Sequence, residues 1–291
     1  MMSKKQKCVI LKMEVGMLEE LYKIFKECFP TTLISKEEFE KKLDFNDSEV
    51  IKEYDENINL IGYSIIRENC ISLICVKPEF QKKGHGTKLL IESEKKIKST
   101  GFKEILLGYK ADSTSLYMGV PILNNQNHTF FTMHQYDSDF TYYDVNISND
   151  VPLEAPDTEE IRQYTAINTL EYPDVKILFM QLLEQTDKKM YDRYFLDNKM
   201  NYIFCRKNNK LAGLCAYRIA EEASIITIMD LVAYPNFDLN SKRIMLAEIK
   251  KVQTTHNLGG ICIRNVSNPV LYQQEFQGNI RQKYWRGSKS C

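Results

Sequence analysis

The sequence predicts an α/β fold arranged as two consecutive domains, residues 1–149 and 150–291. The chain has 291 residues, and 43% of them are apolar, which is enough for two hydrophobic cores. Apolar strand-like runs alternate with amphipathic helical patterns along the first half. From about residue 150 a similar order of elements recurs in a less regular form.

The first domain is predicted to contain a strand, two helices, three strands, a helix and a strand. Residues 7–13 are predicted to form the first strand and residues 15–28 an amphipathic helix. The second helix covers residues 35–43, where Ser35 and Glu38 have the spacing of a capping box. Apolar and alternating runs predict the remaining elements, which are strands at 50–54, 60–66, 71–77 and 105–107 and a helix at 86–100.

The second domain begins after residues 151–156, whose prolines are typical of a connector. Its helix at 240–255 places Ile244, Ile249 and Val252 at positions spaced for burial. The other predicted elements are strands at 161–167, 201–206, 212–218, 224–234 and 260–266 and a helix at 174–183.

Residues 70–90 carry the strongest functional signal. An apolar strand ends at a proline, and a basic loop containing glycine then opens into an amphipathic helix. Gly84 and Gly86 have no Cβ, so the backbone can turn tightly and present N–H groups inward, while the helix N-terminus adds partial positive charge. Donors and charges also come from Gln81, Lys82 and Lys83. The segment therefore predicts a pyrophosphate site.

The spacing of this loop differs from two common nucleotide-binding motifs. A Rossmann loop needs G-x-G-x-x-G, with an acidic residue about twenty positions later. A P-loop needs Gly-Lys-Ser/Thr after a four-residue spacer. Here the glycines come at the end of the loop instead.

The loop resembles motif A of the Gcn5-related N-acetyltransferases, Q/R-x-x-G-x-G/A. The preceding strand and proline are similar to the same family, which implies a mixed α+β fold with a central twisted sheet flanked by helices in each domain. The resemblance also implies acetyl-CoA as co-substrate, with its pantetheine on the backbone of Cys75 and Val76 and an amine attacking its thioester. The N–H of Val76 or its neighbour would stabilise the oxyanion. The pyrophosphate would bind Gln81, Lys82, Lys83, Gly84, His85, Gly86 and Thr87.

The catalytic residues of that family are matched less well. Residues 130–136 are similar to its helix F-[YF]-x-x-x-G-[FY], in which a tyrosine in the second place protonates the leaving thiolate, but Phe131 occupies that place here. Strand 71–77 also lacks a carboxylate to act as general base. The remaining candidates for proton transfer are Asp112, Tyr117 and Tyr136, each of which could instead be a turn, surface or core residue.

The second domain resembles the degenerate partner of tandem acetyltransferases. Residues 231–235 are similar to the strand and proline that lead to the loop. Residues 236–243 contain no glycine, however, and Asp238 would repel a pyrophosphate. We therefore expect this domain to complete the fold and to form part of the wall of the acceptor site without binding acyl-CoA.

Residues 111–161 bear on the acceptor because they contain carboxylates but no Lys or Arg. If this interval lines the acceptor cleft, it favours a cationic amine, whereas the alternative is a solvated acidic linker. The predicted function is acetyl transfer to a primary amine of a small cationic molecule. Two other functions stay open, a catalytically silent acyl-CoA sensor or interaction module and a peptide or protein N-acetyltransferase.

Composition limits the other partners. Basic and acidic residues number 39 each, so the overall charge favours neither nucleic acid nor an anionic membrane. The apolar runs are short for a bilayer span and the first residues lack the apolar region of a signal peptide, so we expect a cytoplasmic monomer or homodimer. The eight cysteines and four histidines are dispersed, which predicts free thiols and no metal site.

Overall fold

The structure is a computed structural model that describes residues 4–43, 48–108, 119–121, 126–151, 153, 160–165, 200–207, 210–233 and 239–291. The chain divides into two compact units. Unit 1 comprises Met1–Lys110, Thr114–Phe140 and Trp285–Cys291, and unit 2 comprises Ala111–Ser113 and Thr141–Tyr284. The C-terminal end of the chain therefore belongs to unit 1. The domain boundary after residue 149 stays a prediction.

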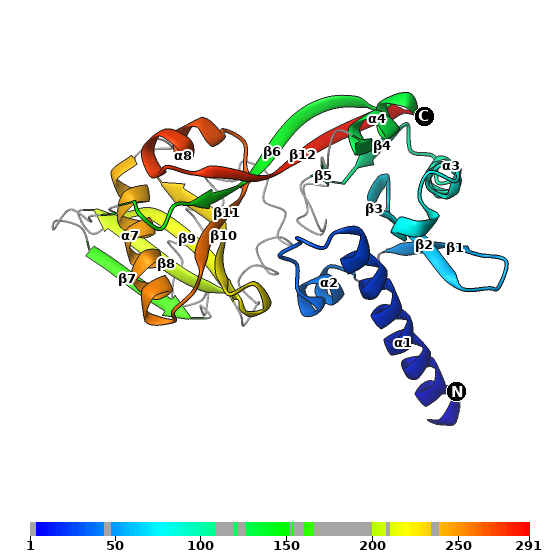
Figure 1. The fold of residues 1–291 in the computed structure, drawn as a ribbon, viewed down its shortest axis with the longest axis horizontal. Helices are drawn as coiled ribbons and strands as arrows, with labels where there is room; N and C mark the ends of the chain where they lie inside the picture. The colour runs from blue at the N-terminus through cyan, green and yellow to red at the C-terminus, as the bar shows by residue number, and fades with distance from the viewer. Residues whose placement is uncertain are drawn as a thin grey trace. The chain divides into compact units, whose positions relative to one another are not determined.

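Unit 1 contains a mixed sheet (Figure 1). Its strands are β1 (Glu49–Tyr54), β2 (Leu60–Arg67), β3 (Cys70–Val76), β4 (Glu104–Leu107), the two-residue β5 (Val120–Pro121) and the outer part of β12 (Asn279–Ser290). They are ordered β1-β2-β3-β4-β12, and β5 pairs with β12. The β3–β4 pair is parallel, whereas β1–β2, β2–β3 and β4–β12 are antiparallel. This confirms the predicted mixed α/β fold.

The helices of unit 1 are α1 (Lys4–Cys28), α2 (Lys36–Lys42), α3 (His85–Ser99), α4 (Gln126–Met133) and the single 3-10 turn η1 (Pro78–Phe80). Tyr63 of β2 donates its hydroxyl to the Leu21 carbonyl of α1 at 2.9 Å. The next residue, Ser64, is hydrogen-bonded to Ser93 of α3 at 2.7 Å. Because neighbouring residues of a strand point to opposite faces, α1 and α3 cover opposite faces of this sheet.

The beginning of the chain corrects one prediction. Residues 7–13 belong to α1, so the strand predicted there is wrong. A short apolar run fits a buried strand and a helix equally well, and no proline separates this run from the amphipathic pattern that follows. The predicted cap of α2 is confirmed, because the Ser35 hydroxyl accepts a hydrogen bond from the N–H of Glu38 at 3.1 Å.

The strands of unit 2 continue the same strand order as β6-β11-β10-β9-β8-β7. The β10–β11 pair is parallel and its neighbours are antiparallel, and helix α7 packs on β8, β9 and β10. The predicted helix at 174–183 lies outside the described residues. The elements of this unit are β6 (Asp137–Ile147), β7 (Glu160–Thr165), β8 (Asn201–Lys207), β9 (Lys210–Ala220), the 3-10 turn η2 (Glu221–Ala223), β10 (Ile225–Ala233), α7 (Leu239–Thr255), β11 (Gly260–Val266) and α8 (Pro269–Phe276).

Two strands run through both units and were not predicted. β6 has residues on both sides of Phe140, and β12 passes from unit 2 into unit 1 at Trp285. Trp285 is 2% exposed and packs in the unit 1 core with Phe131 and Tyr136. A Cβ on Gly119 would come within 2.6 Å of the Trp285 carbonyl oxygen, so the backbones approach closely enough there to require glycine.

Candidate functional site

The loop after β3 is held to the end of that strand by a side chain. The Gln81 amide donates from Nε2 to the Val76 carbonyl at 2.8 Å. Predicted as a cofactor residue, Gln81 thus also positions the loop. The loop itself is exposed from Gln81 to Gly84, and Lys83 places its ammonium 5.5 Å from the centre of the Phe80 ring.

The loop turns through the left-handed region and then enters α3. Lys82 has φ of 59° and Gly84, the residue before the helix, has φ of 90°. The first helical hydrogen bond runs from the Lys88 N–H to the Gly84 carbonyl at 3.0 Å. The preceding N–H groups, those of His85, Gly86 and Thr87, therefore have no acceptor within the helix. Three adjacent donors at a helix N-terminus form a site suited to phosphate oxygens.

The two glycines of the loop have different roles. Gly84 needs its left-handed conformation, which side chains with a Cβ adopt at a cost. Gly86 is helical, and a Cβ there would lie 3.7 Å from the Phe130 ring, which is ordinary contact. The backbone conformation thus favours glycine at Gly84, whereas neither conformation nor packing requires it at Gly86.

A buried carboxylate lies directly behind the loop. Glu53 of β1 accepts a 3.0 Å hydrogen bond from the His85 ring at Oε1 and forms an ion pair with Lys88 at Oε2, with 2.7 Å between the atoms. The Glu53 side chain is 6% exposed. Burial alone would raise the pKa of Glu53, but hydrogen bonds from Lys88 and His85 outweigh it and lower the pKa below 4.5. Both partners belong to the first turn of α3, so Glu53 holds that turn against β1.

The lowered pKa predicts an acid-dependent loss of stability. The charged Glu53 stabilises the folded chain fully above its unfolded pKa of about 4.5, and this contribution is lost as the pH falls through the lower folded value. We expect Glu53→Gln to reduce the free energy of unfolding by about 1–3 kcal/mol at neutral pH. Urea unfolding of both proteins across the acid range should show this difference shrinking as the pH decreases. A difference that stays constant with pH would contradict the assignment.

Helix α4 approaches the same end of α3. The His134 Nε2 lies 3.5 Å from the Thr87 hydroxyl, and the Phe130 and His134 rings meet edge-on with centroids 4.9 Å apart. The first turn of α3 is therefore bordered by β1 on one side and by α4 on another. His134, whose sequence context gave no ligand spacing, lies beside the loop.

The adjoining edge of β3 is open. β4 pairs with β3 only at Cys70 and Ile71, and no other described strand pairs with this edge toward Val76. Lys77 donates its N–H to Ile61 of β2. Because backbone groups alternate between the two edges of a strand, the N–H and C=O of Val76 point to the open edge. The Cys75 side chain is buried on the face of the sheet that α1 covers.

Of the predicted proton-transfer residues, the structure describes only Tyr136. Asp112 and Tyr117 lie outside the described residues. Tyr136 is buried, and its hydroxyl donates to Glu94 at 3.1 Å, two turns along α3 from the loop. Lys289 of β12 also bonds Glu94, at 3.0 Å. Burial first, and then the neighbouring Glu94 carboxylate, raises the pKa of Tyr136, so proton donation would require this cluster to open.

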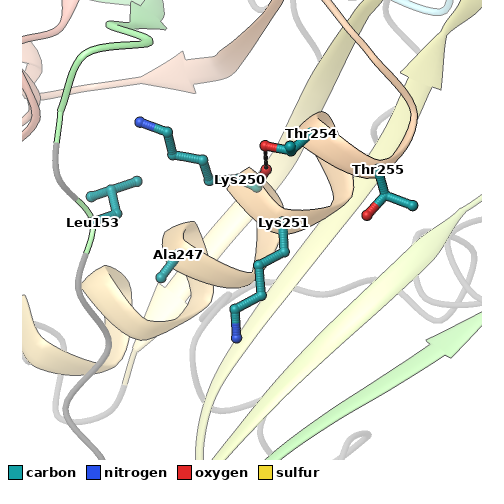
Figure 2. A pocket seen from close by; sticks show the side chains of 6 residues that line it. All are labelled: Leu153, Ala247, Lys250, Lys251, Thr254 and Thr255. Atoms are coloured by element: carbon teal, nitrogen blue, oxygen red, sulfur yellow. Dashed lines mark hydrogen bonds between the residues drawn. The ribbon is translucent and has the colours of Figure 1, made fainter.

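In unit 2, α7 follows β10 as α3 follows β3. A shallow hollow of about 350 Å³ lies along this helix, and Figure 2 shows the Lys250 and Lys251 side chains diverging around it. Lys250 donates to the carbonyls of Asn149 and Val151, and Lys251 donates to Glu248 at 2.5 Å. Both ammonium groups are thus engaged by protein atoms. Residues 234–238, on which the expected loss of a phosphate loop partly depends, lie outside the described residues.

Among the helices that the structure describes, none has both the length and the apolar character needed to cross a bilayer. Within the same residues, no group of three or more His, Cys, Asp and Glu side chains is arranged to hold a metal ion.

Residues 6–120 match the family model described as the acetyltransferase (GNAT) domain. The sequence has no match among curated proteins.

Solved structures share the fold. Over 94% of its length the chain is similar to the Gcn5-related glucosamine N-acetyltransferase region of a fungal multi-domain beta-N-acetylglucosaminidase, with a TM-score of 0.69 and 13% identity, and it spans 37% of that protein. A Gcn5-related N-acetyltransferase from Sphaerobacter thermophilus gives a TM-score of 0.63 and 16% identity over 92% of this chain and 90% of its own. A tandem GNAT protein from the clavulanic acid biosynthesis pathway gives 0.62 and 10% over 84% and 83%.

Proposed function

Because residues 6–120 match the acetyltransferase (GNAT) domain, we propose that the chain transfers an acetyl group from acetyl-CoA to a primary amine. The observation that carries this proposal is the set of three N–H groups at the start of α3 that have no acceptor within the helix, next to the open edge of β3. Helix α3 offers N–H donors for the pyrophosphate of acetyl-CoA, and the adjacent strand β3 offers backbone groups for its extended pantetheine arm, which contains amides.

Each group of the site has a proposed role. The N–H groups of His85, Gly86 and Thr87 bind the pyrophosphate, with Lys82 and Lys83 adding positive charge beside them. The open backbone at Val76 is the part of β3 that faces the pantetheine, whereas the N–H and C=O of Cys75, predicted to share this role, point toward β2, where Cys75 pairs with Tyr63. The Val76 N–H then stands where it can stabilise the oxyanion that develops when the amine attacks the thioester. Positioning of this kind supplies much of the rate when the amine arrives neutral.

The proposed acceptor is a small cationic amine. Within the acidic interval, Asp144 is buried and is bonded to the Tyr284 hydroxyl at 2.7 Å and to the Asn265 N–H at 3.2 Å, so it serves the unit 2 core. Asp137, in contrast, is exposed and free to contribute to a negative surface. The fungal relative is described as acting on glucosamine, a small amine, which supports this class of acceptor.

A calorimetric titration of acetyl-CoA followed by a thiol-release assay tests the proposal. We expect binding at one site per chain and release of CoA with polyamines, aminoglycosides or amino sugars. Peptide amines and uncharged acceptors serve as the comparison. Failure of the chain to bind acetyl-CoA would contradict the proposal. Release of CoA with peptide amines alone would mean that the acceptor is a peptide and not a small cationic amine.

A second candidate is a silent acyl-CoA sensor. Its support is Phe131, which is 7% exposed in the core at the position where the family places a tyrosine acid. Tyr136, whose ring centroid lies 5.9 Å from that of Phe131, is bonded to Glu94 instead. Stoichiometric binding of acetyl-CoA without CoA release on any of the tested amines would favour this candidate.

A further inference from the structure

Two thiols meet where the open edge of β3 ends. Cys75 pairs across the sheet with Tyr63, and Tyr63 donates its hydroxyl to Leu21, so this face of the sheet is covered by α1. Cys28 follows Leu21 by about two turns and therefore lies on the same side of α1. The Cys28 thiol donates to the Val76 carbonyl at 3.2 Å, which places it next to Cys75.

The two thiols differ in access. Cys75 is 1% exposed, and burial together with a hydrogen bond to Cys28 raises the pKa of the Cys75 thiol. Cys28 is half-buried at the last residue of α1. An oxidant in solution thus reaches Cys28 first, and Cys75 is placed to react with the product.

We propose that Cys28 and Cys75 form a peroxide-sensitive dithiol whose disulfide closes the site to acetyl-CoA. Hydrogen peroxide oxidises the Cys28 thiol to a sulfenic acid and is itself reduced to water. The Cys75 sulfur then attacks the Cys28 sulfur, the S–S bond forms, and the sulfenic oxygen leaves as a second water.

The consequence for acetyl-CoA rests on the proposed function. A disulfide holds its two Cα atoms about 4.4–6.8 Å apart, so bond formation moves the Cys28 sulfur from the Val76 carbonyl to Cys75. In the reduced chain only a hydrogen bond holds the Cys28 thiol at the Val76 carbonyl, so the end of α1 can move aside for the pantetheine. The disulfide ties the end of α1 covalently to β3 beside this edge and removes that freedom. By linkage, bound acetyl-CoA protects the dithiol to the same degree that the disulfide weakens acetyl-CoA binding.

The first test measures the disulfide without any cofactor. The full chain is treated with hydrogen peroxide, its remaining thiols are blocked with N-ethylmaleimide, and the unreduced peptides are analysed by mass spectrometry. We expect a cross-linked pair containing Cys28 and Cys75 that disappears on reduction and is absent from Cys28→Ser and Cys75→Ala. The matched control, Cys291→Ser, removes the exposed C-terminal thiol and should leave the pair unchanged. Absence of the pair from the oxidised wild type would overturn the proposal.

The second test measures acetyl-CoA affinity before and after oxidation. We expect oxidation to raise the Kd of the wild type about tenfold, to be reversed by dithiothreitol, and to leave Cys28→Ser unaffected. A cross-link that forms without a change in Kd would overturn the proposed closure. If the reduced protein binds no acetyl-CoA, the proposed function fails, while the peptide analysis still decides whether the dithiol exists.

Discussion

Replacing Gly84 with valine is expected to raise the Kd for acetyl-CoA by about 10- to 100-fold, because a β-branched residue in the left-handed region costs about 1–3 kcal/mol of strain. Relieving that strain would turn the loop and move the N–H groups of the first helical turn away from the phosphates. No atom lies within 4 Å of a Cβ at this position, so the effect would come from the backbone and not from a clash. Calorimetric titration of acetyl-CoA measures it.

The chain offers a matched control at the other end of α3. Gly101 also has positive φ, +88° against +90° at Gly84, and its Cβ would likewise meet open space. Gly101→Val should therefore lower stability to a similar extent while leaving acetyl-CoA affinity unchanged. Equal losses of affinity in both variants would mean that the loop has no special part in binding.

Replacing Trp285 with alanine is expected to destabilise unit 1 by about 3–5 kcal/mol, because the substitution removes a large buried ring from the core. The ring packs against Phe131 and against the edge of His128, although Trp285 lies near the C-terminus of the sequence. Guanidinium unfolding followed by circular dichroism gives the loss of stability. Acetyl-CoA affinity at low denaturant should fall in parallel, because the loop proposed to bind acetyl-CoA belongs to the same unit.

Two neighbouring substitutions separate packing from other causes. The Trp285 Nε1 has no hydrogen-bond partner among the described residues, so Trp285→Phe loses no bond and should cost less than about 2 kcal/mol. Tyr284 is adjacent in β12 but bonds Asp144 in unit 2. Tyr284→Ala should therefore destabilise unit 2 first. If Trp285→Ala left both the stability of unit 1 and acetyl-CoA binding intact, the assignment of Trp285 to the core of unit 1 would be wrong.

Local patterns predicted most of the elements. Local sequence predicted the cap at Ser35, the strand that ends at Val76 and the helix that starts after Gly84, because each depends on residues close in sequence. The error at residues 7–13 arose in a short apolar run, where local pattern does not distinguish strand from helix. The strands β6 and β12 were missed because their partners lie far away in the chain.

The same distinction applies to the site. The sequence by itself predicted the loop at residues 81–87 as a phosphate site and indicated its family, because a strand, a loop with glycines and a helix follow each other directly. Only the tertiary structure placed Glu53 behind that loop, Cys28 beside Cys75 and Tyr136 against Glu94. These contacts join separate elements, and their pairing depends on how the helices pack on the sheet, which no local pattern of residues specifies.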